Sequence, residues 1–435
     1  MEDTNSIKRE LKKQQLRKQM VSNSGPIRFQ PSDYEEEERE EGSQETEKKR
    51  LGRRVLTGGI ILLAVFLAVG GIMYRDAYHQ YTEYNISWET DFLTGEEGQL
   101  QTESSFTAYK DFGENVIKYT KDGAAYIDAK GKTVWIQAYE MRSPIVAVNG
   151  DYAAIADQQG NNIYIFDKSG CQGIATALLP ILKVSVSAKG LAAAILEDAK
   201  SNYIAMFQKN GETLDIVIKS RLSGDGYPLD FCLSPEGNQV ICSYMYINQG
   251  RMDCRVVFYN FSEIGKNTSE NRLVAGFDED FKGSMAPRVH FLDEIYSFAC
   301  SDKGLSFFSS RNLASPQLLL QIPMENQIRS LFYSDRYIGV ILDNEEGEAP
   351  YRMEIYQPTG DLVLKKEFNF RYQHVSIDGE QILLWNENSF QAYNLAGTQK
   401  FYGVFEETIS KVKAGRFSNS YLIISPNKMM EITLQ

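Results

Sequence analysis

Residues 144–178 read PIVAVNG, DYAAIADQQG, NNIYIFDKSG and CQGIATAL, which are four short apolar runs with turn-forming residues between them. The runs are rich in Ile, Val, Ala and Tyr, whereas Gly, Asn, Asp and Gln occupy their boundaries. Brief apolar stretches that alternate with turn residues, without a helical period, are typical of antiparallel strands joined by tight hairpins. The stretch therefore predicts one four-stranded antiparallel sheet.

One element of this unit, an apolar strand that ends in a short turn with glycine, recurs along the chain. Copies are found at 125–132, 163–170, 205–211, 354–360 and 391–397. A glycine in such a turn adopts positive φ at little steric cost and lets the chain reverse into the next strand. Repetition of the same hairpin indicates a repeat architecture.

The spacing of the strands indicates how such sheets are assembled. Candidate innermost strands begin near Phe106, Ile145, Val184, Leu229, Val289, Ile328, His374 and Ile409. The intervals average about 43 residues, which is typical of one four-stranded propeller blade. The sequence thus predicts an all-β fold, a β-propeller over residues 85–435. Eight blades are favoured, and seven remain an alternative because the first and last units are the least regular.

The last unit contains material for three strands only, ISKVKAGRFS, NSYLIISPN and KMMEITLQ over residues 409–435. A fourth strand has to come from the start of the domain, and residues 85–92 are the candidate. Pairing of these two distant segments would close the ring and leave no long sheet edge exposed.

Before the repeats lies the stretch 55–74, VLTGGIILLAVFLAVGGIMY, which contains no charged residue. As a helix it would extend about 30 Å, the thickness of a bilayer's hydrocarbon core. We therefore expect one transmembrane helix that anchors the chain in a lipid bilayer. The side chains expected in the membrane are Leu56, Ile60, Leu63, Phe66, Leu67, Ile72 and Tyr74. A cleaved signal peptide is the alternative, although residues 1–54 form an unusually long segment before its apolar region.

Basic residues on the N-terminal flank predict the orientation of this helix. They are Lys48, Lys49, Arg50, Arg53 and Arg54, against Arg75 on the other side. The positive-inside rule then predicts a cell-membrane protein with residues 1–54 as a cytoplasmic, mostly disordered tail. Residues 75–84 are the expected juxtamembrane stalk, and the propeller lies outside the cytoplasm.

Composition limits the partners of the expected outer domain. Residues 55–435 hold 33 basic against 46 acidic side chains, which argues against nucleic acid because its phosphates require clustered cations. The five cysteines lack metal-ligand spacing, and four of them lie among apolar residues as buried thiols do. A bridge between Cys242 and Cys254 is the less favoured alternative.

Two resemblances follow from these patterns. The segment YIDAKGKTVW at 126–135 resembles the strand–turn–Gly–Trp element of PQQ-like and WD40-like propeller repeats. In its layout of charged tail, single span and divergent propeller, the chain resembles the DUF5711 family of Firmicute membrane proteins. That resemblance implies a place in the cell envelope and no known activity.

Signals of catalysis are weak. The adjacent cysteines of quinone-dependent propeller dehydrogenases are absent, and no GxSxG, Walker A or dinucleotide-binding motif is present. His290 and His374 begin innermost strands and would face a central channel, where a strand-end histidine is more often a hydrogen-bonded structural residue. The acidic loops 278–280 and 343–348 lack EF-hand spacing, so solvated charge is favoured over calcium binding. We assign no catalytic, cofactor-binding or metal-binding residue and expect no cofactor.

These observations favour a non-enzymatic binding or scaffold protein of the cell envelope. Its expected partners are the lipid bilayer and, on the outer side, a protein or a cell-wall polymer, with the insertion at 260–287 as a candidate contact. An envelope enzyme, either glycosidase-like or quinone-dependent, is one alternative. A ligand sensor that signals to a cytoplasmic partner is the other.

Overall fold

The computed structural model describes residues 58–71, 74, 77–92 and 106–435 of the 435-residue chain. These belong to two units, Met1–Asp76 and Ala77–Gln435, which are described separately. In the first unit residues 58–71 are helical, and Ile60, Leu63, Phe66, Leu67 and Tyr74 are exposed. Within the described residues, no helix combines the length and apolarity that a membrane span requires.

Several predicted features of the N-terminal region lie outside the described residues. They are the tail at 1–54, its flanking Lys48, Lys49, Arg50, Arg53 and Arg54, and the anchor residues Leu56 and Ile72. The second unit begins at Ala77 and so includes most of the segment expected to be a stalk.

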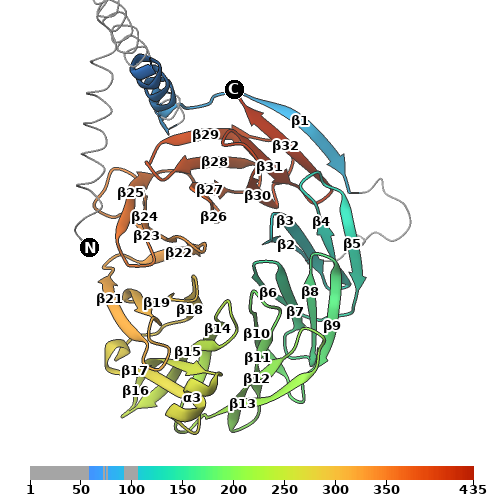
Figure 1. Cartoon of the computed structure of the whole chain (residues 1–435), viewed down its shortest axis with the longest axis vertical. Coiled ribbons are helices and arrows are strands. Elements are labelled where there is room, and N and C mark those ends of the chain that lie inside the picture. Colours follow the sequence, from blue (N-terminus) through green and yellow to red (C-terminus); the bar gives the residue numbers. More distant parts are fainter. Residues whose placement is uncertain (1–57, 72–73, 75–76, 93–105) are drawn as a thin grey trace, which may run out of the picture. The chain divides into compact units, whose positions relative to one another are not determined.

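The described residues of the second unit form eight four-stranded antiparallel sheets arranged as the blades of a ring (Figure 1). Blade 1 consists of β2 (Thr107–Phe112), β3 (Asn115–Thr120), β4 (Gly123–Ile127) and β5 (Thr133–Ala138). Blade 2 consists of β6 (Pro144–Asn149), β7 (Tyr152–Asp157), β8 (Asn162–Asp167) and β9 (Gly170–Thr176). Blade 3 consists of β10 (Ile181–Val186), β11 (Ala192–Glu197), β12 (Ser201–Phe207) and β13 (Thr213–Arg221). Blade 4 consists of β14 (Tyr227–Leu233), β15 (Gln239–Asn248), β16 (Arg251–Asn260) and β17 (Leu273–Phe277).

The other half of the ring follows the same plan. Blade 5 consists of β18 (Arg288–Phe291), β19 (Tyr296–Ser301), β20 (Gly304–Ser309) and β21 (Gln317–Pro323). Blade 6 consists of β22 (Ile328–Tyr333), β23 (Ile338–Asp343), β24 (Tyr351–Tyr356) and β25 (Leu362–Phe368). Blade 7 consists of β26 (His374–Asp378), β27 (Gln381–Trp385), β28 (Ser389–Asn394) and β29 (Gln399–Val404). Blade 8 consists of β30 (Lys411–Ala414), β31 (Ser420–Ile424), β32 (Lys428–Leu434) and β1 (Tyr84–Asp91).

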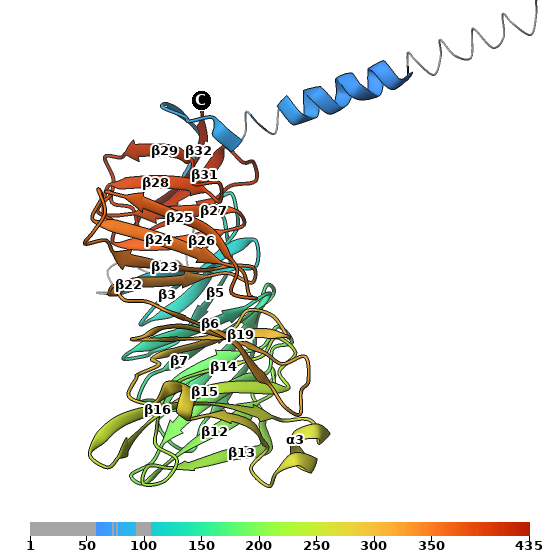
Figure 2. The ribbon, with the colours of Figure 1, turned by 90° about the vertical axis from the view of Figure 1, so that its left-hand side faces the viewer.

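The predicted eight-bladed propeller is confirmed, and a seven-bladed ring is excluded. Each innermost strand begins within three residues of its predicted start. The two short helices α3 (Glu263–Thr268) and η1 (Glu279–Phe281) belong to the insertion of blade 4, where α3 protrudes beyond the sheets (Figure 2). The outer strand β17 occupies the middle of that insertion, so part of the predicted contact loop is needed to complete the blade.

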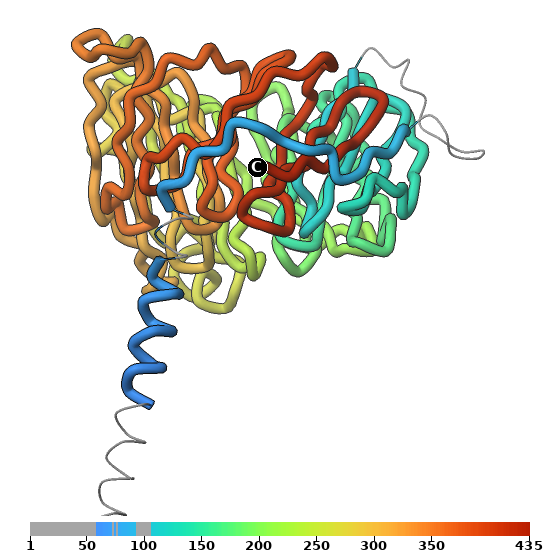
Figure 3. The backbone as a smooth tube through the Cα atoms, turned by 90° about the horizontal axis from the view of Figure 1, so that it is seen from above, coloured from blue at the N-terminus to red at the C-terminus, as the bar shows by residue number. Residues whose placement is uncertain are grey.

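Blade 8 is assembled from both ends of the unit, as the strand count predicted. Strand β1 pairs antiparallel with β32, from Tyr84 opposite Leu434 to Asp91 opposite Lys428. Figure 3 shows the two segments side by side. The indole Nε1 of Trp88 donates a hydrogen bond of 2.7 Å to Glu431, which adds a side-chain contact to the ladder. The backbone groups of β32 that would otherwise form an open edge are therefore paired.

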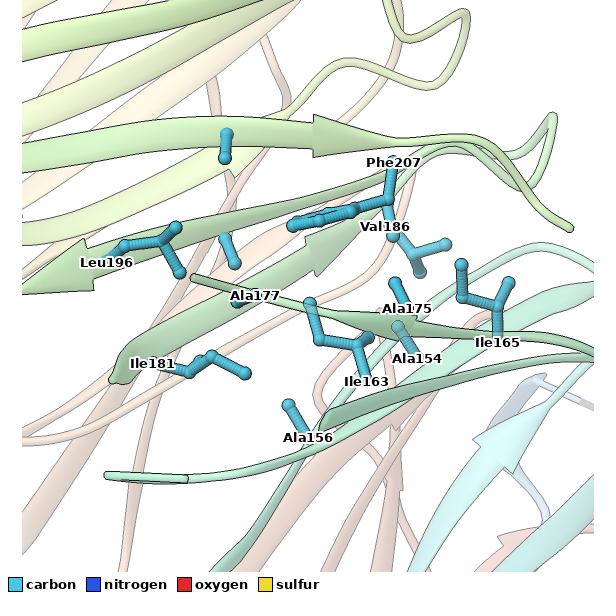
Figure 4. Close-up of a cluster of buried hydrophobic side chains, with 13 residues drawn as sticks. Ala154, Ala156, Ile163, Ile165, Ala175, Ala177, Ile181, Val186, Leu196 and Phe207 are labelled. Carbon is cyan, nitrogen blue, oxygen red and sulfur yellow. The ribbon is translucent and has the colours of Figure 1, made fainter. Parts of the chain in front are cut away.

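Apolar faces of neighbouring sheets pack against each other around the ring. Between blades 2 and 3, Ala154 and Ala156 of β7 and Ile163 and Ile165 of β8 meet Phe207 of β12 (Figure 4). All five side chains are buried, and the alanines let two twisted sheets approach closely. Burial of this apolar surface, at roughly 25 cal/mol per Å², is the main favourable contribution to stability.

The predicted glycine hairpins share one turn in four of the five copies. The N–H of Gly131, Gly211, Gly360 and Gly397 each donates to the carbonyl three residues earlier, and all four glycines have positive φ between 76° and 91°. In the copy at 163–170, Asp167 pairs directly with Gly170 and only two residues form the turn. The shared sequence pattern therefore supports two different hairpin geometries.

The hairpin glycine Gly211 and Gly173, which lies within β9, set how closely blades 2 and 3 approach. A Cβ on Gly211 would lie 2.3 Å from the carbonyl oxygen of Ile174 in β9, and a Cβ on Gly173 would lie 2.2 Å from the backbone of Asn210. Each glycine therefore allows the other blade's backbone to make contact. Neither position has room for a side chain.

We predict that Gly211→Ala destabilises the propeller by about 3 kcal/mol or more, because it combines backbone strain with an inter-blade clash. Gly250→Ala is the matched control, since Gly250 has a φ of +78° and no atom lies within 4 Å of the place where the added methyl group would sit. We expect this control to cost about 1 kcal/mol. Urea unfolding of the purified full chain measures both, and equal losses would refute the role of the inter-blade contact.

Candidate functional site

A cavity of about 440 Å³ lies where the innermost strands of blades 1 to 6 converge. Its wall is formed by β2, β6, β10, β14, β18 and β22, which line the inside of the ring (Figure 1). Val146 and Val184 supply apolar surface, while charged side chains enter from four of the strands. This volume lies in the range of small-molecule binding sites.

Asp230 organises one side of the cavity. The residue is on β14, and its side chain is only 5% exposed. One carboxylate oxygen pairs with Lys183 Nζ at 2.7 Å, and the other accepts the N–H of Val289 at 3.0 Å and pairs with Arg288 at 3.4 Å. Because these partners come from β10 and β18, one carboxylate connects three adjacent blades. A buried charge requires this degree of pairing to offset its desolvation.

Asp111 holds a second cluster across the closure of the ring. It lies at the end of β2 in blade 1 and pairs with Lys411 at 2.8 Å and Lys413 at 3.4 Å, both on β30 of blade 8. Lys413 also lies 3.7 Å from Asp378 of blade 7. Desolvation acts to raise the pKa of the Asp111 carboxyl, but the two lysine ammonium groups outweigh it and hold the pKa below its usual value.

Lys110 lies beside Asp111 and differs from the other cations. Within the described residues it forms no ion pair, and its side chain is exposed to the cavity. Desolvation by the surrounding wall lowers the pKa of Lys110, and the positive charges of Lys411 and Arg288 lower it further, although the neighbouring Asp111 carboxylate acts in the opposite direction. Lys110 is thus a cation that is accessible to a ligand and repelled by its neighbours.

Next to these charges, His290, Cys232 and Tyr333 form a neutral part of the wall. The Nδ1 of His290 lies 3.2 Å from Cys232 Sγ, and its ring centre lies 4.3 Å from that of Tyr333. Burial, together with Arg288 and Lys110, lowers the pKa of His290 to about 3. Burial raises the pKa of the Cys232 thiol to about 12, so both groups are uncharged at neutral pH.

The two histidines singled out in the sequence have different positions. His290 lines the cavity as predicted, whereas His374 stacks on Trp385 with a ring separation of 5.3 Å and does not belong to the lining. Desolvation lowers the pKa of His374, and the charge of Lys411 adds to this effect. His374 is therefore an exposed residue that contacts Trp385 outside the cavity lining.

Four charged residues of the cavity were not predicted from the sequence, namely Lys110, Lys183, Asp230 and Arg288. Each occurs within or beside a short apolar run at an innermost strand, as in LKVSV and PLDFCL. A charged residue at an inward position of an otherwise apolar strand is the signal that could have found them. Whether such a charged residue belongs to a binding site depends on which blades lie near each other in the ring. The sequence of a single strand does not show this.

Other features singled out in the sequence are spread over the surface or the core. All five cysteines are free, and Cys242 lies opposite Val257 rather than opposite Cys254 in the β15–β16 ladder. In the acidic loops, Asp278 pairs with Arg255 at 3.1 Å and Asp343 with Arg329 at 2.6 Å. The described residues contain no group of three or more His, Cys, Asp or Glu side chains with metal-site geometry.

We predict that His290 makes stability depend on pH. Its pKa is about 3 in the folded protein, against 6.5 for an unperturbed histidine, so the unfolded chain binds a proton that the folded protein does not. Stability should therefore fall as pH decreases below 6.5, by up to about 1.4 kcal/mol per pH unit. His290→Asn should reduce this slope between pH 5 and 6.5, whereas His374→Asn, at an exposed residue, should change it less. Urea unfolding at each pH measures the slope, and an unchanged slope in His290→Asn would contradict the prediction.

Comparison with known proteins identifies the fold and the family. The solved structure of the Dos1 propeller has a TM-score of 0.51 and 10% identity, covering 80% of this chain and 95% of that chain. BamB from Moraxella catarrhalis has a TM-score of 0.45 and 11% identity, and the match covers 81% of this chain and 100% of BamB. Hydrazine synthase of Kuenenia stuttgartiensis has a TM-score of 0.41 and 11% identity, and the match covers 79% of this chain and 98% of the synthase chain. At these identities the likeness concerns the fold alone.

No curated protein sequence matches the chain. The family DUF5711, described as a family of unknown function, matches residues 77–434, which is nearly the whole propeller unit. The chain belongs to the DUF5711 family.

Proposed function

We propose that the protein is a single-pass, membrane-anchored propeller that binds a partner on the outer side of the cell membrane and acts without catalysis. The observation that favours binding over catalysis is the central cavity. It has the size of a ligand site, and its carboxylates are paired with cations while its thiol and imidazole are uncharged. Such a wall can hold a ligand but offers little reactivity.

The state of the cavity groups favours binding over the enzyme alternatives. A glycosidase needs a carboxylic acid whose pKa is raised so that it can donate a proton. The pKa of the Asp111 carboxyl is lowered instead, and Asp230 is fully engaged by Lys183, Arg288 and the backbone. The Cys232 thiol, with its pKa raised to about 12, is a poor nucleophile.

The membrane part of the proposal rests on the sequence. The uncharged stretch 55–74 has the length of a span, and the basic residues of 48–54 favour a cytoplasmic N-terminus. Ile60, Leu63, Phe66 and Leu67 are exposed within their own unit, so their apolar surface has no partner among the described residues. A lipid bilayer would cover it.

A protein or cell-wall polymer is the proposed outer partner, and one face of the ring offers apolar contacts. Strands β15 and β16 are longer than those of the other blades, and at their tip Ile247 lies opposite Met252. These side chains are 79% and 55% exposed, and Leu178, between β9 and β10, is 96% exposed. Both connections emerge on the same face, because the second hairpin of a blade and the link to the next blade lie at the same sheet end.

We predict that Ile247→Cys, in a chain with Cys171→Ser to remove the half-buried native thiol, reacts with a membrane-impermeant maleimide in intact cells. The other native cysteines are buried and should not react. A benzophenone attached at position 247 should form a photo-crosslinked adduct. Ser315→Cys, in an exposed loop between β20 and β21, should be labelled equally but form no adduct.

Labelling of both positions only after lysis would overturn the proposed location. Labelling in intact cells without any crosslinked adduct at position 247 would overturn the proposed contact face. The two readouts thus test the membrane orientation and the binding role separately.

A further inference from the structure

We infer that the central cavity binds a small oxyanion, a ligand that carries a carboxylate or phosphate group, with Lys110, Arg288 and Lys183 as the anion-binding residues. This inference deepens the proposed binding function, because it names the chemistry of one ligand. It rests on the charge of the cavity, the accessibility of its cations and the shape of its wall.

The charge balance of the ring centre is opposite to that of the chain. In the part of the chain that the structure describes, the charged side chains that line the cavity are three cations and two carboxylates. They are Lys110, Lys183 and Arg288 against Asp111 and Asp230. Three against two leaves a formal charge of +1, whereas the whole chain has −12. Lys411 and Lys413, which are not part of the lining, add positive charge next to Asp111. A concentration of positive charge inside an acidic protein attracts small anions.

Lys110 is where an anion would be stabilised most. Its ammonium group is desolvated by the wall and repelled by Lys411 and Arg288, and Asp111 beside it is already shared by two other lysines. A bound oxyanion would add to the counter-charge that Asp111 supplies only in part. Opposite charges that are partly removed from water interact more strongly than the same pair on an open surface.

Arg288 and Lys183 are held in place for the same ligand. Both pair with Asp230, which is 5% exposed, yet the Arg288 side chain remains 50% exposed. Asp230 therefore fixes the guanidinium from one side through one nitrogen and leaves most of its five N–H donors available. The remaining N–H groups can bind a carboxylate or phosphate in the bidentate manner that arginine favours.

The rest of the wall limits what the anion can be attached to. Val146 and Val184 are apolar, and the rings of His290 and Tyr333 form a neutral surface beside the cations. Strands from six blades enclose the space, so its volume of about 440 Å³ accepts a small molecule rather than a folded domain. The expected ligand has a compact apolar or aromatic body and one anionic end.

The test uses the purified full chain in a mild neutral detergent. Inorganic phosphate and citrate serve as probes, each titrated by calorimetry and by thermal unfolding against chloride at the same ionic strength. We expect saturable binding of at least one probe and a rise in the unfolding temperature, since a ligand that binds only the folded state stabilises it. The probe that binds shows whether phosphate or carboxylate is preferred.

Three variants assign the binding to the cavity. Lys110→Gln should weaken it about tenfold or more, because one charge-assisted contact is lost. Lys110→Arg should retain most of the affinity. Lys209→Gln, which removes the same charge from an exposed turn between β12 and β13, should leave binding unchanged.

A second measurement needs no variant. The bound probe should slow acetylation of Lys110 in the wild-type chain, but not that of Lys209, as followed by peptide mass spectrometry. Failure of both probes to bind, equal binding by the two glutamine variants, or unprotected Lys110 would overturn the inference. These results are independent of the labelling of intact cells, so failure here leaves the membrane orientation and the contact face standing.

Discussion

Closure of the ring is the constraint on which the structure depends. A sheet that ends without a partner leaves a row of backbone N–H and C=O groups unpaired, and such an edge costs stability and invites aggregation. Here the C-terminal three strands of blade 8 receive β1 from the start of the unit, over 300 residues away along the chain. Every blade thereby has four strands and two neighbours, and no blade can be removed without opening the circle.

The closure also explains why charges concentrate at the centre. Among the described residues, the apolar cluster between blades 8 and 1 is the smallest of the eight inter-blade clusters, with Val116, Ile127, Leu422, Ile424 and Met429 as its buried members. The ion pair between Asp111 and Lys411 crosses this same interface. Polar contacts thus supplement a modest apolar interface, and they bring lysines to the edge of the cavity. One arrangement of side chains serves both the closure of the ring and the proposed binding site.

The centre of this propeller is suited to binding because contacts between neighbouring blades hold its polar side chains in place. Asp230 joins three blades, Asp111 joins blades 1 and 8, and the neutral pair of Cys232 and His290 joins blades 4 and 5. Side chains fixed in this way lose little conformational entropy when a ligand arrives. The longer hairpin β15–β16 adds an apolar tip at the periphery, so the centre and the rim offer two chemically different surfaces.

The amino-acid sequence by itself determined the blades, because strand length, apolar alternation and turn glycines are local properties. It predicted the start of each innermost strand within three residues, the number of blades and the closing strand at 85–92, although the hairpin at 163–170 showed that one pattern can adopt two turns. Only the tertiary structure decided which charges meet. Lys110, Lys183, Asp230 and Arg288 lie on four strands that are far apart in sequence, and they become neighbours because the ring brings all innermost strands to one centre. Pairing, burial and pKa follow from that convergence, since electrostatic interactions depend on distance in space rather than along the chain.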